Sequence, residues 1–202
     1  MTSPAFRPLG QADLILASAS PRRSMLLERL GLSPRVVPSD VEEVFGPDWT
    51  PIEVVESLSH QKASDVAAKH PEADLVLGAD TIVVLNGEIL GKPKDVADAT
   101  RMLSGLSGNW HQVYTGFTLI DPKGGRTVTR HATTEVRIRE LSDSEIVAYI
   151  ATGEPMDKAG SYAIQGMASI LVSEIRGEYS NVVGLPVPSV DAAWRELGWS
   201  VL

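Results

Sequence analysis

The chain has 202 residues and a formal net charge of −8, with 43% hydrophobic and 22% charged residues. This composition is typical of a soluble globular protein, and the length suits about one domain. The acidic balance disfavours general binding to nucleic acids or anionic membranes, so we expect neither as a partner. Cysteine is absent, which excludes disulfides, thiolate catalysis and cysteine-based metal sites.

The predicted domain organisation is a short arm followed by one folded domain. Pro4, Pro8 and Gly10 indicate a flexible N-terminal arm over residues 1–11, and no segment of 12–202 has the composition of a linker. No apolar run approaches the ~20 residues of a membrane span. The first residues also lack the pattern of a signal peptide. We therefore expect a cytoplasmic protein.

Helix and strand patterns alternate along the chain, which predicts an α/β fold. An apolar strand at 14–17 is followed by a helix that begins at Ser20-Pro21, where serine suits the N-cap and proline the first helical position. A short strand is expected at 35–38. A capping box at Thr50-Pro51-Ile52-Glu53 then predicts a helix that ends before Pro71.

The central part of the chain alternates in the same way. An apolar strand at 75–77 is predicted to end at Gly78-Ala79-Asp80-Thr81, and Asn86-Gly87 predicts the turn of a hairpin over 82–90. The remaining expected elements are a helix at 96–106, strands at 112–121 and 126–139, a helix from Ser142 to about Gly153, a hairpin from Ile170 turning at Arg176-Gly177, and a helix at 189–197.

Two arginines stand at the predicted helix start Ser20-Pro21-Arg22-Arg23. A helix N-terminus carries partial positive charge and unpaired N–H groups, so arginines there are unfavourable unless an anion binds between them. The motif therefore fits a polyphosphate site. The alternative is two solvated arginines paired with surface carboxylates.

Carboxylates occur at two places that suit catalysis. Asp80 follows an apolar strand, where ligands gather in open α/β sheets, and could bind magnesium or accept a proton from water. Glu42 and Glu43 lie in a loop and offer hard oxygen ligands for magnesium or manganese. Taken alone, Asp80 also fits a turn aspartate, and the glutamates fit a solvated loop.

Lys62 and Lys92 could each balance phosphate charge, although a lone lysine usually lies at the surface. The polar, glycine-rich segment 153–166 is too long for a tight turn, and such loops usually bind a ligand or are mobile. A purely structural loop is the alternative. The amide of Gln165 in this segment can pair with a donor and an acceptor on a base edge.

Several motifs occur in a fixed order: Ser18-x-Ser20-Pro21-Arg22-Arg23, the glutamate pair ending at Glu43, Lys62-Ala63, Gly78-Ala79-Asp80-Thr81, Gly91-Lys92-Pro93, Tyr114-Thr115-Gly116, Glu154-Pro155-x-Asp157-Lys158-Ala159-Gly160-x-Tyr162-x-Ile164-Gln165-Gly166 and Gly184-Leu185-Pro186. In this combination the sequence resembles the Maf family of nucleoside triphosphate pyrophosphatases. The resemblance runs from about Leu14 to the C-terminus.

The resemblance implies a fold and an activity. The fold is a twisted mixed β-sheet flanked by helices, in two lobes with a central cleft, of the Maf or inosine triphosphatase-like type, and a homodimer is implied. The activity is hydrolysis of a nucleoside triphosphate to the monophosphate and pyrophosphate with a divalent cation, Mg²⁺ or Mn²⁺. A nucleoside triphosphate is then the expected partner.

The resemblance also implies roles for individual residues. Asp80 matches the proton acceptor, and the other charged catalytic positions are Glu43, Lys62 and Lys92. Ser20 and Arg23 match the turn that grips phosphate. The positions associated with choice of base in the dTTP/UTP branch are matched by Arg22, Thr81 and Gln165. Glu43 with Asp80 is the candidate metal pair, although either carboxylate could instead position a lysine.

Two other functions remain compatible with these motifs. The first is the same reaction on 7-methyl-GTP or another modified nucleotide, although the 7-methyl-GTP branch departs from Arg22, Thr81 and Gln165. The second is a non-catalytic, nucleotide-binding regulator of septum formation. A pyrophosphatase acting on dTTP and UTP, with modified pyrimidine nucleotides as further candidate substrates, is the principal hypothesis, because the matched arginine, threonine and glutamine are all present.

Overall fold

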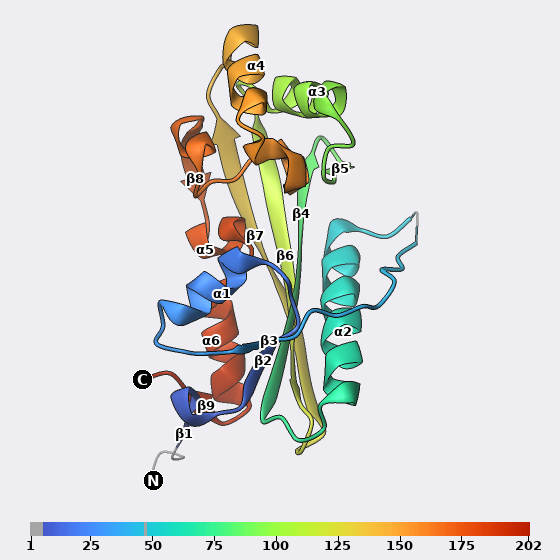
Figure 1. Ribbon diagram of the computed structural model, residues 1–202, viewed down its shortest axis with the longest axis vertical. Helices are drawn as coiled ribbons and strands as arrows, with labels where there is room; N and C mark the ends of the chain where they lie inside the picture. Colours follow the sequence, from blue (N-terminus) through green and yellow to red (C-terminus); the bar gives the residue numbers. More distant parts are fainter. Residues whose placement is uncertain (1–5, 47) are drawn as a thin grey trace. The chain divides into compact units, whose positions relative to one another are not determined.

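A computed structural model describes residues 6–46 and 48–202 (Figure 1). Within these ranges, seven strands form one sheet in the order β3-β2-β4-β6-β7-β8, with β5 paired to β4. The sheet contains parallel and antiparallel pairs, so the predicted mixed sheet flanked by helices is confirmed. No helix in the described ranges is both long and apolar enough to cross a membrane.

The elements follow the alternation expected from the sequence. The strands are β1 (Arg7–Pro8), β2 (Leu14–Leu16), β3 (Arg35–Val36), β4 (Leu75–Leu85), β5 (Glu88–Leu90), β6 (Trp110–Asp121), β7 (Arg126–Ile138), β8 (Val172–Arg176) and β9 (Trp199–Ser200). The α-helices are α1 (Pro21–Glu28), α2 (Pro51–Lys69), α3 (Val96–Leu106), α4 (Asp143–Ala151), α5 (Tyr179–Val183) and α6 (Val187–Glu196).

The chain divides into two compact units, which we describe separately. Unit 1 comprises residues up to 80 together with 115–132 and 184–202. Unit 2 comprises 81–114 and 133–183. Three long strands, β4, β6 and β7, supply residues to both units.

In unit 1, α2 covers one face of the sheet, and α1 and α6 cover the other (Figure 1). The core under α2 consists of small and branched apolar side chains from the helix and from two parallel neighbouring strands, β2 and β4. Two glycines allow a very close approach. A Cβ atom on Gly78 of β4 would lie 2.5 Å from the Ser59 carbonyl oxygen, and one on Gly116 of β6 would lie 2.2 Å from that of Val55. The helix backbone therefore packs directly on the strands.

The residues that precede the sheet are paired with the end of the chain. β1 runs parallel to β9, with Arg7 opposite Trp199. Leu9, in a short 3₁₀ turn (Leu9–Gln11), is 1% exposed. Residues 7–9 of the predicted flexible arm thus have strand or core contacts, whereas arm residues 1–5 lie outside the described ranges.

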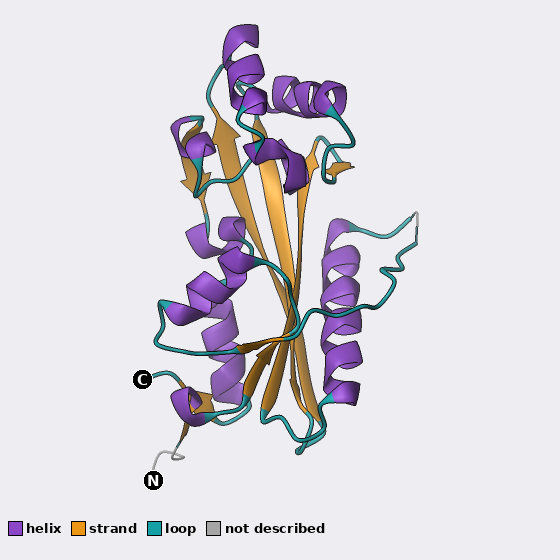
Figure 2. Ribbon diagram, viewed as in Figure 1, coloured by secondary structure: helices purple, strands orange, loops and turns teal. Residues whose placement is uncertain are grey.

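Unit 2 contains the remaining residues of β4, β6 and β7. The predicted hairpin is confirmed: β4 and β5 pair antiparallel around Asn86-Gly87, and both turn residues have positive φ. β8 pairs antiparallel with β7, while α3 packs against α4. Between Gly153 and Leu171 the chain forms the short 3₁₀ helices η2 (Glu154–Asp157), η3 (Ala159–Ser161) and η4 (Met167–Ile170) (Figure 2).

Two predicted elements differ from the structure. The strand expected at 75–77 continues to Leu85, because the buried apolar run resumes after Thr81 and the same strand pairs with β5. The segment expected to form a hairpin at 170–177 instead contributes one strand, β8, to the edge of the main sheet and continues into α5. A glycine after an apolar run marks a turn, but it does not identify the partner of the strand.

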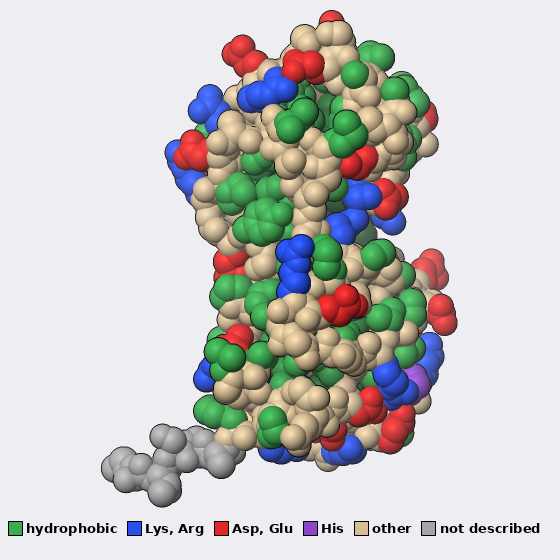
Figure 3. All heavy atoms as spheres, turned by 60° about the vertical axis from the view of Figure 1, so that its left-hand side comes forward, with side chains coloured by type: hydrophobic (Ala, Val, Ile, Leu, Met, Phe, Trp, Pro, Cys, Tyr) green, Lys and Arg blue, Asp and Glu red, His purple; other side chains and the backbone are tan. Residues whose placement is uncertain are grey.

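Hydrophobic side chains are also present at the surface of unit 2, and several groups of them are visible on the face shown in Figure 3. The large apolar residues exposed in this unit include Met167, Ile170 and Tyr179. They come from η4 and from the start of α5, the segments that follow the glycine-rich loop.

Candidate functional site

The start of α1 directs one of its two arginines into the protein. Ser20 is the N-cap and Pro21 the first helical residue, as predicted, but the Ser20 hydroxyl does not cap the helix. Arg23 is 9% exposed. Its Nε donates to the Gly184 carbonyl oxygen at 2.8 Å and its Nη1 donates to the Ser18 hydroxyl at 2.9 Å. The arginine is therefore held by unit 1 rather than solvated.

Burial lowers the pKa of Arg23 from its usual value. Nearby Asp80 and Glu43 act in the opposite direction and favour the charged guanidinium, while the neighbouring Arg22 adds to the lowering. A buried cation is costly unless opposite charge compensates it. Two carboxylates therefore already lie within electrostatic range of the predicted phosphate-binding arginine.

Lys62 connects these carboxylates. Its ammonium group lies 2.6 Å from Asp80 Oδ1 and 2.8 Å from Glu43 Oε1. The Lys62 and Asp80 side chains are 16% and 12% exposed, whereas that of Glu43 is 49% exposed. Three residues predicted from separate sequence motifs thus form one charged cluster in unit 1.

The loop that carries Glu43 is fixed by α2. Gln61 Nε2 donates to the Val44 carbonyl oxygen at 2.7 Å, and the Val44 N–H donates to Gln61 Oε1 at 3.2 Å. Because Gln61 precedes Lys62 on the helix and Val44 follows Glu43, these bonds place the glutamate beside the lysine. Gln61 was not predicted to contribute to the site, and a single glutamine on a helix gives no sequence signal for such a role.

Asp80 lies within a strand, which corrects its predicted place at a strand end. It is the sixth residue of β4, and the strand continues to Leu85. Its side chain lies on the face toward which a Cβ at Gly78 would point, because successive positions of a strand alternate between the two faces. That is the face against which α2 packs.

The candidate metal pair is consistent with a cation held jointly with substrate. The described residues hold no group of three or more histidine, cysteine or acidic side chains arranged to bind a metal. Magnesium, however, is commonly bound by one or two carboxylates together with substrate phosphates. Glu43 and Asp80 supply such a pair, and Lys62 contacts one oxygen of each.

The other predicted residues, Thr81, Lys92 and Gln165, belong to unit 2. Thr81 directly follows Asp80 on β4. The motif that contains Lys92 is tied to the glycine-rich segment, since the Gly160 N–H donates to the Gly91 carbonyl oxygen at 3.1 Å. Gly160 has positive φ and packs against Val83, where a Cβ would lie within 2.9 Å of that side chain. The two glycines thus bring two predicted motifs together.

Gln165 presents an unused acceptor. Its side-chain oxygen Oε1 is buried and has no hydrogen-bond partner within the described ranges. A buried amide oxygen without a partner is unfavourable in the free protein. It is therefore suited to accept a hydrogen bond from a ligand.

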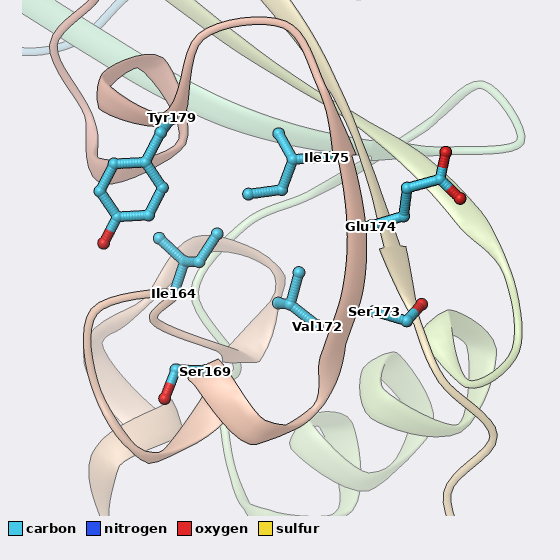
Figure 4. A pocket seen from close by; sticks show the side chains of 7 residues that line it. All are labelled: Ile164, Ser169, Val172, Ser173, Glu174, Ile175 and Tyr179. Atoms are coloured by element: carbon cyan, nitrogen blue, oxygen red, sulfur yellow. The ribbon is translucent and has the colours of Figure 1, made fainter.

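A pocket of about 390 Å³ lies on unit 2 next to this glutamine (Figure 4). Ile164, which precedes Gln165, points into it toward Val172 and Ile175 of β8, and Tyr179 lies across from them. None of the predicted site residues lines this pocket. Ile164 is 6% exposed, so its buried side chain fixes the chain directly before Gln165.

Sequence comparison identifies relatives over almost the whole chain. The family model described as "Maf-like protein" matches residues 13–197. Relatives named "dTTP/UTP pyrophosphatase" include those of Alkaliphilus metalliredigens (51% identity, 86% of this chain and 90% of the relative), Citrifermentans bemidjiense (51%, 93% and 96%) and Bacillus cytotoxicus (53%, 86% and 89%). The chain, with its buried Arg23 and its Lys62–Asp80–Glu43 cluster, therefore belongs to the Maf family.

Proposed function

We propose that this protein hydrolyses dTTP and UTP to the corresponding monophosphate and pyrophosphate. The observation that carries the proposal is the cluster in which Lys62 contacts both Asp80 and Glu43 within electrostatic range of buried Arg23. The names of relatives at about 50% identity support the same activity and the same pair of bases.

The charges of the cluster suit cleavage of a phosphoanhydride. Such reactions depend mainly on positioning and on neutralising phosphate charge. Arg22 and Arg23 at the start of α1 supply two cations, and Lys62 supplies a third. Ser20 contributes the helix N-terminus, where backbone N–H groups favour an anion. Lys92 is proposed as a further phosphate contact.

Asp80 is proposed as the proton acceptor. A water molecule attacks the α-phosphorus, its oxygen forms the new P–O bond, and its proton passes to the Asp80 carboxylate. The bond from the α-phosphorus to the bridging oxygen breaks, and pyrophosphate leaves with the electron pair. Lys62 holds Asp80 through the 2.6 Å contact, which orients the carboxylate.

A divalent cation, Mg²⁺ or Mn²⁺, fits this scheme and would be held by Asp80, Glu43 and the substrate phosphates. When bound, it supplies charge neutralisation for the pyrophosphate leaving group. Lys62 contributes the neighbouring positive charge from the protein itself. The same donors allow either role for Asp80, as base or as ligand.

Base selection is assigned to Arg22, Thr81 and Gln165. The unpartnered Oε1 of Gln165 can accept a hydrogen bond from the N3–H group of uracil or thymine. Cytosine has an acceptor at N3 instead, so the same oxygen would be left opposite another acceptor. This difference favours dTTP and UTP over CTP.

Hydrolysis in ¹⁸O-labelled water tests the reaction directly. Purified protein is incubated with dTTP, UTP, CTP, purine triphosphates and 7-methyl-GTP, with Mg²⁺ and then with Mn²⁺. We expect dTMP and UMP that carry the label, together with unlabelled pyrophosphate. Label in pyrophosphate would place the attack on the β-phosphorus and would contradict the proposed geometry.

Two variants sharpen this test. Asp80→Asn should abolish turnover, whereas Asp191→Asn, which removes a surface carboxylate paired with Arg195 on α6, should not.

The nucleotide experiment also separates the alternative functions. Pyrophosphate release from 7-methyl-GTP alone would support the proposed reaction but overturn the assigned base. Nucleotide binding without hydrolysis would favour a regulator of septum formation. A homodimer stays a prediction, which light scattering tests.

A further inference from the structure

The segment that carries Gln165 is a tight turn followed by η4. The Gly166 N–H donates to the Ala163 carbonyl oxygen at 2.9 Å, so Ile164 and Gln165 occupy the two central positions of the turn. Ile164 is 6% exposed, and its buried side chain anchors the turn (Figure 4). The orientation of Gln165 therefore depends on what holds the two ends of this turn.

A single carboxylate, that of Glu154, holds the end that follows Gln165. Its Oε2 accepts from the Met167 N–H at 2.9 Å, and its Oε1 accepts from the Ala168 N–H at 3.3 Å. These two N–H groups belong to the first residues of η4, which lie directly after the turn.

Tyr149 links the same carboxylate to the other end of the turn. Its hydroxyl donates to Glu154 Oε1 at 2.8 Å and accepts from the Ala163 N–H at 3.4 Å. Tyr149 lies on α4 and is 6% exposed, so it is itself fixed by the core of unit 2. Glu154 and Tyr149 together therefore contact the chain on both sides of Gln165.

A side chain at position 166 would displace the Glu154 carboxylate from this turn. A Cβ on Gly166 would lie 2.3 Å from Glu154 Oε2. Burial would raise the pKa of Glu154, but the hydrogen bonds from Met167, Tyr149 and Ala168, together with the charge of Lys158, hold this pKa below its ordinary value. The carboxylate is consequently charged at neutral pH and accepts all three bonds.

We propose that Glu154 is a positioning residue for base recognition: with Tyr149 it fixes the turn that aims the Gln165 amide at the pyrimidine. This inference rests on the proposed function and extends it, because Glu154 and Tyr149 act through Gln165 and not on the phosphates. The ligand class is a nucleotide whose base donates a hydrogen bond to the Gln165 oxygen.

The test compares a nucleotide with a base and a phosphate ligand without one. In Glu154→Gln, the amide NH₂ faces the Met167 N–H, so one of the three bonds is lost while the side chain keeps its size. We expect kcat/KM for UTP to fall about tenfold, the usual effect of losing a hydrogen bond to a charged group. The inhibition constant of ribose 5′-triphosphate, which has no base to contact Gln165, should change less than about twofold.

A double-mutant cycle identifies the route of the effect. If Glu154 acts through Gln165, then Glu154→Gln adds little once Gln165→Ala is present. Glu140→Gln is the matched control, because Glu140 is an exposed glutamate of the same unit, and it should leave both measurements unchanged. If Glu154→Gln fails to fold, Tyr149→Phe removes the hydroxyl that joins Glu154 to Ala163 and takes its place in the cycle.

The outcomes separate this inference from the proposed function. Equal losses for UTP and for ribose 5′-triphosphate, or additive losses in the cycle, would mean that Glu154 is only structural. A selective loss in Gln165→Ala but none in a folded Glu154→Gln would overturn the positioning role alone. A wild-type protein that releases no pyrophosphate from any nucleotide would overturn the proposed function itself.

Discussion

Gly78 controls how closely α2 approaches β4, and its replacement by alanine tests that contact. The added Cβ would lie 2.5 Å from the Ser59 carbonyl oxygen, 2.7 Å from the Ala63 nitrogen and 2.9 Å from the Ala63 Cβ. Two of these atoms are backbone atoms, so no side-chain rotation relieves the contact. Ordinary van der Waals contact begins at 3.4 Å, and the helix must therefore move away by about 0.9 Å.

This displacement has two measurable consequences. Overpacking of this kind costs roughly 2 kcal/mol, which corresponds to a fall in Tm of about 4–8 °C for a chain of this length. If the whole shift reaches the Lys62–Asp80 contact, its length increases from 2.6 Å to about 3.5 Å. This distance is the limit of a hydrogen bond. Turnover should therefore fall as well as stability.

Thermal unfolding followed by circular dichroism, together with pyrophosphate release, measures both effects. Gly10→Ala is the control, because an added Cβ at Gly10 meets nothing within 4 Å and should leave Tm within a degree or two. If Gly78→Ala melts and turns over like the wild type, the close packing of α2 on β4 does not position Lys62, and the argument for the cluster's geometry fails.

Two further predictions concern ionisable groups. Lys62→Met should lower kcat at least tenfold by removing the contact to Asp80. Lys69→Met, which breaks an exposed pair with Asp65 on the same helix, should leave kcat unchanged. Equal turnover in the two variants would contradict the role of Lys62. Burial lowers the pKa of His111 from 6.5 to about 4. The free energy of unfolding that depends on neutral His111 is therefore fully present above pH 6.5. Roughly 3 kcal/mol of it is lost as the pH falls toward 4. Urea unfolding at pH 7 and pH 4.5 should therefore show a smaller loss for His111→Gln than for the wild type, and parallel losses would refute this assignment.

Local sequence signals predicted the elements that local interactions determine. The capping boxes at Thr50 and Ser142 are both present, with each serine or threonine side chain bonded to the backbone three residues later. The helix at 96–106 and the hairpin turn at Asn86-Gly87 also match. In each case the residues that cause the structure lie within a few positions of one another.

Elements that depend on distant partners were less predictable. The apolar run at 75–77 gave no indication that the strand continues through Asp80 into the predicted hairpin, and the pairing of β8 with β7 spans more than thirty residues. The bond from Arg23 to the Gly184 carbonyl, 161 residues away, is a similar case. Ser18 and Gly184 both stand in the motifs that carried the family resemblance, but no spacing assigned either of them to Arg23.

The charged cluster and the close packing of α2 have one structural cause. Gly78 and Asp80 are two residues apart on β4 and face the same side, while Ser59, Lys62 and Ala63 are on one side of α2. Because Gly78 lacks a side chain, the backbone of α2 comes close enough for Lys62 to contact a carboxylate two residues further along the strand. A larger residue at position 78 would move the lysine away from Asp80 without altering either charged group. The glycine is therefore as necessary to the geometry of the site as the charges themselves.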